Sequence, residues 1–531
     1  MRLAFGMILI LTLFVHNAGA HEEDAAKAKV PLQLGKVSFP TTCLASSQPA
    51  FERSVALLHS FWFAEAEKAF RDVLAHDPGC AIATWGIAAL RIGNTFAGNA
   101  TPADAQAATE AIERGRAIGA KSERERTYIE AVSAYWKAFR DTSHGARMQA
   151  LTEAFATLAA RYPNDDEAQV FYAIYLTATQ SPTDKNFTAT LKAAGILEPL
   201  FAKYPEHPGV AHYLIHAYDY PPIAQKGLVA ARRYAQIAPS APHALHMPSH
   251  IFTRVGAWQD SVDMNRRSAN TAREERSPGD HLHALDYLVY ANLQLARDKE
   301  ALAAIEEARG IASLNPAALP IWYSLAAMPA RYTIERGMWK EAAQLEPRES
   351  RFPWTAAMTT YAKALGAARS GDPAGAARSA QELDKTAQDL RAAKNEYWAT
   401  EVGVQAIGAQ AWAAFAAGNR DVALERMRAA ADLEDQSEKS AVSPGRLIPA
   451  RELLGDMLME LGRPVEALAE YERSQVRDPN RLRALYGAGL AASQAGDKQK
   501  ARSYFARVAQ LAGTSEARPE LRKVRDYLAA N

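Results

Sequence analysis

The sequence is poor in cysteine, because Cys43 and Cys80 are the only two in 531 residues. Two cysteines leave room for one disulfide bond, which an oxidising compartment would permit. A disulfide also needs the two Cα atoms to lie close together, and spacing along the chain does not establish that. The pairing of these two cysteines is therefore left open.

Net charge and long apolar runs are also lacking. The 61 lysines and arginines nearly balance the 60 aspartates and glutamates, so the formal net charge is +1. Without a basic tail or stripe, nucleic-acid binding has little electrostatic support. After the N-terminal segment, no stretch approaches the roughly twenty apolar residues of a membrane-spanning helix. We therefore expect neither a nucleic-acid partner nor an integral membrane segment in the mature chain.

The usual signatures of cofactor and active sites are absent as well. The sequence has no P-loop, no dinucleotide-binding glycine pattern, no EF-hand loop, no CxxCH and no HExxH motif. Ser249 and His250 are neighbours, but no G-x-S-x-G motif on a strand–helix pattern accompanies them, so a hydrolase triad is not indicated. We therefore expect no organic cofactor, and motifs leave the catalytic residues unassigned.

The N-terminus has the pattern of a secretory signal peptide. Arg2 precedes an almost wholly apolar run, Leu3–Val15, and Ala18–Ala20 supplies the small residues of a cleavage site. We expect residues 1–20 to be removed by cleavage near Ala20, and residues 21–45 to form a leader or linker. No cysteine follows the cleavage site to carry a lipid anchor. The mature protein is therefore expected in the periplasm or secreted.

A helical period dominates the mature chain, and two segments near its end repeat one another. Residues 452–479 align with the segment that starts at Leu485, at an offset of 34 residues. The matching pairs are Gly455 with Gly489, Gly462 with Gly496, Ala467 with Ala501, and Tyr471 with Phe505. Small residues allow two helices to approach closely, the aromatic residue fills the gap to the next hairpin, and proline ends the second helix.

This pattern resembles the tetratricopeptide-repeat family, whose period is about 34 residues. Similar alanine–aromatic–proline spacings around Ala66 and Ala230 extend the resemblance over most of residues 46–517. The resemblance implies an all-α, right-handed superhelical solenoid of helical hairpins. We expect hairpins over residues 46–345, 355–433 and 449–531, the last ending in a capping helix. The resemblance also implies a concave groove that binds a peptide or a partner protein.

Eight of the thirteen histidines lie between His207 and His283. The repeat numbering of the resembling family makes His212, His243 and His283 equivalent on three successive hairpins, and leaves His207 and His281 outside the register. The groove-facing set that it implies is His212, His216, Asp219, His243, His246, His250, His283 and Asp286. Independently of the resemblance, spacings of three and four residues place side chains one above another on a helix.

These residue types favour a transition-metal site. Neutral imidazole binds zinc, copper, nickel or iron, and we expect copper or zinc first. Asp219 and Asp286 are expected either as ligands or as groups that orient an imidazole. An alternative is that the histidines are structural and hydrogen-bond neighbouring tyrosines such as Tyr213 and Tyr287.

Pro248 leaves the local structure open. It could kink a helix that carries His243, His246 and His250, because proline disrupts a helix interior. Alternatively a helix could start at Pro248, and His243 and His246 would then lie in the preceding loop.

We expect an exported binding or assembly protein, rather than an enzyme, with a metal site on its concave face and a peptide or protein in its groove. An alternative is a metal-dependent hydrolase or oxidase, which would need a closed pocket with about three convergent ligands and one open position. A third possibility is a metal-free peptide receptor.

Overall fold

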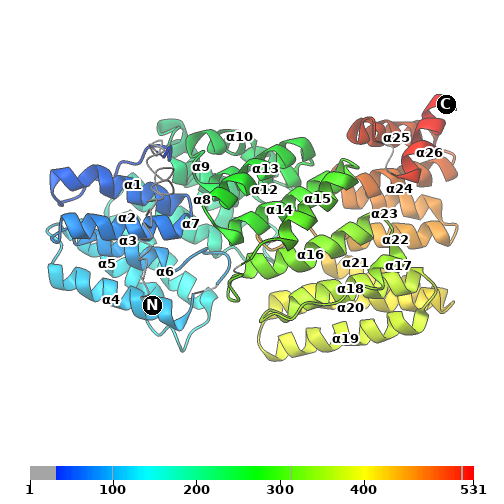
Figure 1. Ribbon diagram of the computed structural model, residues 1–531, viewed down its shortest axis with the longest axis horizontal. Helices are drawn as coiled ribbons and strands as arrows, with labels where there is room; N and C mark the ends of the chain where they lie inside the picture. Colours follow the sequence, from blue (N-terminus) through cyan, green and yellow to red (C-terminus); the bar gives the residue numbers. More distant parts are fainter. Residues whose placement is uncertain (1–31, 99, 313, 516–517, 531) are drawn as a thin grey trace, which may run out of the picture. The chain divides into compact units, whose positions relative to one another are not determined.

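The computed structural model describes residues 32–98, 100–312, 314–515 and 518–530. The predicted signal peptide and residues 21–31 of the predicted leader lie outside the described residues. Leu34–Asn531 form one compact unit, in which helices follow one another in chain order and the described residues contain no strand (Figure 1). Consecutive helices pack against each other as hairpins. The all-α solenoid of helical hairpins expected from the sequence is therefore confirmed.

The described helices fall into four runs along the chain. The first run is α1 Gln48–His59, α2 Phe63–His76, α3 Ile82–Leu90, α4 Pro102–Ile118, α5 Glu123–Trp136, α6 His144–Arg161, α7 Asp166–Ala178 and α8 Thr188–Lys203, after a short 3-10 turn at Ala45–Ser47. The second is α9 Pro208–Tyr218, the 3-10 turn Ala224–Gly227, α10 Leu228–Ile237, α11 Pro242–His246, α12 Pro248–Arg254, α13 Trp258–Glu274, α14 Pro278–Gln294 and α15 Asp298–Arg309.

The third run is α16 Leu319–Glu335, α17 Trp339–Ala342, α18 Pro353–Arg369, α19 Pro373–Ala392, α20 Glu396–Ala416 and α21 Arg420–Glu434. The last is α22 Ala450–Glu460, α23 Pro464–Arg477, α24 Leu482–Gln494, α25 Lys498–Ala512 and α26 Pro519–Ala530. Among these described helices, none is long and apolar enough to cross a membrane.

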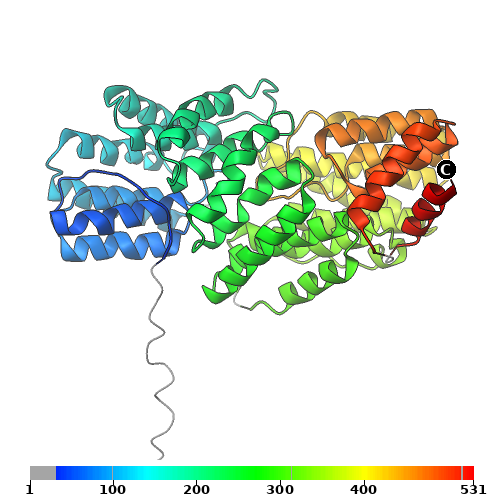
Figure 2. The same ribbon diagram turned by 90° about the horizontal axis from the view of Figure 1, so that it is seen from above.

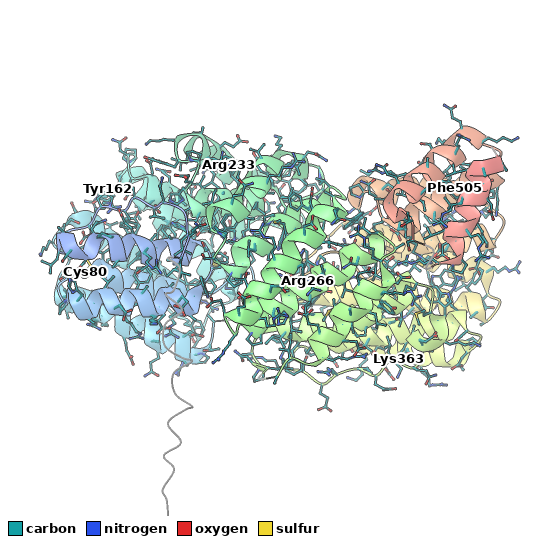
Figure 3. The ribbon with its side chains drawn as sticks, turned by 45° about the horizontal axis from the view of Figure 1, so that its top comes forward. Cys80, Tyr162, Arg233, Arg266, Lys363 and Phe505 are labelled. Atoms are coloured by element: carbon teal, nitrogen blue, oxygen red, sulfur yellow. A yellow bond between two sulfur atoms is a disulfide. The ribbon has the colours of Figure 1, made fainter. Side chains whose placement is uncertain are left out.

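The contacts between the two helices of each C-terminal hairpin follow the pattern expected from the sequence. A Cβ atom added to Gly455 would lie 2.7 Å from the Tyr471 ring, and one added to Gly489 would lie 2.5 Å from the Phe505 ring. A side chain at either position would clash, so glycine allows the ring of the second helix to pack onto the backbone of the first. Figure 3 labels Phe505 in this C-terminal part. The alanines of the second helices, Ala467 and Ala501, are fully buried.

The C-terminal hairpins also contact helices of the second run. The Trp258 indole donates to the Asn480 carbonyl (2.7 Å) and the Leu482 amide donates to the Gln294 side chain (2.9 Å). Figure 2 shows the orange and red hairpins together with the green helices of the middle of the chain. Segments about 200 residues apart in sequence therefore stabilise one another.

The chain before α1 packs against the first hairpins. Phe39 is fully buried, and a disulfide joins Cys43 to Cys80, which Figure 3 labels. The pairing that the sequence left open is therefore present. From Leu34 onward, the segment expected to be a leader belongs to the compact unit.

Candidate metal centre

Three successive hairpins supply the histidines of the candidate site. His212 and His216 lie on α9, and His283 lies on α14. His243 and His246 lie on α11 and His250 on α12, and the helix break falls at Met247, with Pro248 as the first residue of α12. His243 and His246 are therefore helical, and the alternative that places them in a loop is wrong.

His212, His216 and His243 form one group, here named cluster one, in which one nitrogen from each lies within 4.8 Å of the others. The Nε2 atom of His212 lies 3.1 Å from Nε2 of His216 and 3.2 Å from Nε2 of His243. The other ring nitrogen of His212, Nδ1, lies 2.6 Å from the His59 carbonyl oxygen. A carbonyl can only accept, so Nδ1 carries the proton and Nε2 points a lone pair at the two other histidines.

His246, His250 and His283 form cluster two, again with one nitrogen each within 4.8 Å. His246 Nε2 lies 3.2 Å from His250 Nε2. His250 Nδ1 donates to the Asp219 carboxylate at 2.9 Å. His246 Nδ1 lies 2.7 Å from Asn265 Oδ1, and Asn265 Nδ2 donates to the Ser261 carbonyl, which fixes the orientation of the amide. Both Nδ1 atoms therefore donate, and the two Nε2 atoms of neutral imidazoles present lone pairs to each other.

Two more atoms matter for cluster two: the Tyr287 hydroxyl oxygen and the Nδ1 atom of its own member His283. The Tyr287 hydroxyl lies 3.3 Å from His250 Nε2 and 3.1 Å from the Ser443 carbonyl oxygen. When it donates to the carbonyl, its oxygen presents a lone pair to His250. His283 Nδ1 is buried and has no hydrogen-bond partner among the described residues. Facing lone pairs and unpartnered buried nitrogens are costly, and a proton or a cation at this position would relieve the cost.

The imidazoles are neutral at neutral pH. Burial lowers the pKa of His212, His216, His243, His246 and His283 well below its ordinary value, and neighbouring histidines lower it further. Burial also lowers the pKa of His250, although Asp219 opposes this effect. Protonation is therefore a poor way to relieve the facing lone pairs, and neutral imidazole is the form that binds metal ions.

Asp219 orients a histidine and does not join either cluster. Burial raises the pKa of its carboxyl, but Lys439, Arg254 and His250 lower it more, so the group is ionised. Arg254 Nε donates to it at 2.8 Å, and Lys439 Nζ lies at 3.3 Å. Burial lowers the pKa of Lys439 to about 8. The carboxylate thus holds His250 in the tautomer that turns Nε2 toward cluster two.

The structure does not bring Asp286 into either cluster. Its carboxylate is fully buried and forms an ion pair with Arg331. His281 also lies elsewhere, because it pairs with Glu307 at 2.8 Å.

His207 belongs to a third group, with His59 and Glu167, whose nitrogen and oxygen atoms also lie within 4.8 Å of one another. His207 Nδ1 accepts from the Val210 amide and caps α9, and both His207 and His59 donate to Glu167. The lone pairs in this group are satisfied, which indicates a structural role.

The two clusters are neighbours at the wall of one cavity. Ring centroids of different clusters lie 6.0 Å apart for His216 and His250, and 6.1 Å apart for His243 and His246. The cavity has a volume of about 1180 Å³, and His216, His243, His250 and His283 all line it. Both clusters can therefore be reached from the same space.

Two successive repeats build their clusters in the same way, which the repeat numbering of the sequence did not reveal. His246 and His250 follow His212 and His216 by 34 residues, the period of the repeat. Each pair takes its third histidine from the next hairpin, His243 or His283. The repeat numbering of the resembling family instead makes His212 and His243 equivalent, because it counts back from the small residue on the second helix of each hairpin. The shared offset of the two pairs was the available signal.

A scan of family models and a search of curated proteins find no match to this chain. A search of solved structures matches 140 chains. One is the crystal structure of the APC/C hetero-tetramer Cut9-Hcn1, with 10% sequence identity and a TM-score of 0.28, covering 92% of this chain and 96% of that chain. A likeness with this TM-score supports no conclusion, so the fold assignment rests on the helices and hairpin contacts of the chain itself.

Proposed function

We propose that the protein binds two transition-metal ions, one at each cluster, and uses them in metal-dependent catalysis. The observation that carries this proposal is the pair of Nε2 atoms of His246 and His250, 3.2 Å apart. Asn265 and Asp219 hold the ring protons on the opposite nitrogens. A cation between the two lone pairs turns a repulsive contact into two coordinate bonds.

The spacing supports metal coordination. Two nitrogens bound at about 2.0–2.1 Å in tetrahedral geometry lie about 3.3–3.4 Å apart. The Nε2 separations in the clusters are 3.1 and 3.2 Å. An all-imidazole set suits zinc or copper and disfavours magnesium or calcium, which prefer oxygen ligands.

The surroundings favour an enzyme over a purely structural metal site. Each cluster offers three protein ligands, which is the number that catalytic sites provide while they keep a position open. Four of the six histidines line the cavity, so this position would face a space that a substrate can enter. Such an ion would polarise a substrate oxygen or activate water. The protein or peptide partner implied by the repeat resemblance stays a prediction.

We further propose that the protein is exported to the periplasm or secreted. The N-terminal pattern of residues 1–20 supports this location. The Cys43–Cys80 disulfide agrees with it, since disulfides persist in oxidising compartments.

The test is elemental analysis of untagged protein purified without chelator, then reloaded with zinc or copper(II) and desalted. We expect about two ions per chain in the native protein. His212→Ala should lose the ion of cluster one and His250→Ala that of cluster two, leaving about one ion in each variant. His281→Gln is the control, because His281 pairs with Glu307 outside both clusters. A native protein that retains no stoichiometric metal after reloading would overturn the proposal.

A further inference from the structure

The cavity at the clusters has aromatic walls. We name it the aromatic chamber. Six half-buried aromatic side chains line it, and they come from segments far apart in sequence: Phe61, Phe63, Phe96, Trp354, Tyr397 and Trp398. A volume of about 1180 Å³ exceeds that of a single water-sized site by far and accommodates an organic molecule. Half-buried rings around such a space offer faces for stacking.

The aromatic rings approach the histidines directly. Phe96 stacks on His216 with centroids 4.3 Å apart and ring planes 26° apart. Phe61 stacks on His243 at 5.3 Å and 20°. Trp354 on α18 and Trp398 on α20 stack on each other at 5.1 Å and 10°, and both line the chamber. Aromatic rings from the first and third runs of the chain therefore face the same space as the histidines.

The charge around the clusters favours an anionic ligand. All six histidines would bind an ion as neutral ligands. The positive charge of a bound ion would therefore not be neutralised by the residues that hold it. Asp219, the carboxylate next to cluster two, is itself balanced by Arg254 and Lys439. The charged side chains that line the chamber carry both signs and supply no net positive charge: Arg276, Arg351 and Lys394 against Glu65, Glu275, Asp280 and Glu396. An open metal position would therefore supply the attraction for an anionic oxygen.

Resting on the proposed function, we infer that the aromatic chamber binds an aromatic molecule that carries an anionic oxygen donor, a carboxylate or a phenolate. The oxygen lies at the clusters and the ring stacks between the aromatic walls. An aliphatic acid of equal size would use the same oxygen contact but lose the stacking, because it has no π face.

The test measures binding by titration calorimetry to zinc-loaded protein whose metal content is determined on the same sample. Benzoate and cyclohexanecarboxylate share size and donor group, and we expect benzoate to bind about five- to tenfold tighter. Benzamide, which lacks the negative charge, should bind more weakly than benzoate. The probe 4-nitrophenolate distinguishes a phenolate from a carboxylate preference.

A variant locates the binding. Trp398→Leu should weaken benzoate binding about fivefold and leave cyclohexanecarboxylate nearly unchanged. Trp322→Leu is the matched control, because the Trp322 indole donates to the Asn315 carbonyl outside the chamber.

The outcomes separate the two proposals. Protein that holds two zinc ions but binds both acids equally would overturn the aromatic ligand and leave metal binding intact. Benzoate binding of equal strength with and without zinc would overturn the anchoring of the oxygen at the metal. Protein that retains neither zinc nor benzoate would overturn both proposals.

Discussion

Asp219 shows how one side chain sets the chemistry of cluster two. Its carboxylate accepts a hydrogen bond from His250 Nδ1–H and also accepts from Arg254 and Lys439. It directly follows α9, the helix that carries His212 and His216 of cluster one, and its partner His250 lies on the next hairpin. The orientation of His250 therefore depends on a residue of the preceding repeat.

We expect Asp219→Asn to lower the zinc affinity of cluster two about 10- to 100-fold, because His250 loses the carboxylate that orients it. Cluster one should keep its affinity and serve as the internal reference. The measurement is a competition titration against a chromophoric chelator, which resolves the two binding steps. An equal loss at both clusters would contradict the prediction.

Asp286→Asn is the matched control for this variant. Like Asp219→Asn, it removes the carboxylate that lies nearest to a buried arginine, Arg331 here and Arg254 there, so both variants should lose about 3–5 kcal/mol of stability. Asp286 faces neither cluster, so its variant should bind zinc with unchanged affinity. This comparison separates an effect on the site from an effect on folding.

Single residues also show what could be predicted from the sequence. The histidines of both clusters were all in the predicted set, because helical spacing groups those of one helix and the repeat numbering of the resembling family places successive hairpins along one groove. The role of Asp286 was not predictable, since its partner Arg331 lies 45 residues away on another hairpin. Spacing cannot show whether a carboxylate finds an arginine or faces an imidazole.

At the scale of the helical element, the repeat pattern predicted the hairpins because it reflects packing. The Tyr471 ring lies between Gly455 and Gly487, where an added Cβ would come within 2.7 and 2.4 Å of it. The volume of the Tyr471 ring therefore fixes where the ring packs and against which residues. The sequence shows this directly, as an aromatic residue matched by glycines on the neighbouring helices. The helix break at Met247 was less predictable, because a proline can kink a helix or begin one.

We expect Gly455→Ala to destabilise the protein by about 1–3 kcal/mol, because the added methyl group overpacks the Tyr471 ring. In a Tyr471→Leu background the same change should cost less, with a coupling of about 1–2 kcal/mol. Urea unfolding of the four proteins gives the coupling. Gly403→Ala is the control, since nothing lies within 4 Å of its added Cβ and alanine favours the helix there by up to about 1 kcal/mol. Additive effects would refute the proposed contact.

At the scale of the whole compact unit, residues 436–448 reach back to the candidate metal centre. We name them the bridging segment. Lys439 pairs with Asp219, and Ser443 accepts from Tyr287 through its carbonyl. Ser443 Oγ also accepts from the Tyr323 hydroxyl at 2.7 Å. Contacts across more than 150 residues of sequence follow no periodic pattern, and for this reason sequence reasoning missed them.

Because Asp219 holds both His250 and Lys439, metal binding at cluster two should stabilise the bridging segment. We expect zinc at about 100 times its dissociation constant to slow amide hydrogen exchange in residues 436–448 by up to about 100-fold, the limit set by linkage. The readout is exchange followed by mass spectrometry, with α25 as the internal reference. Lys439→Met should remove most of this protection while zinc still binds, because it cuts the connection and keeps the ligands. If zinc protects the segment equally in Lys439→Met, the coupling runs through Tyr287 and Ser443 instead, and the role assigned to Lys439 is wrong.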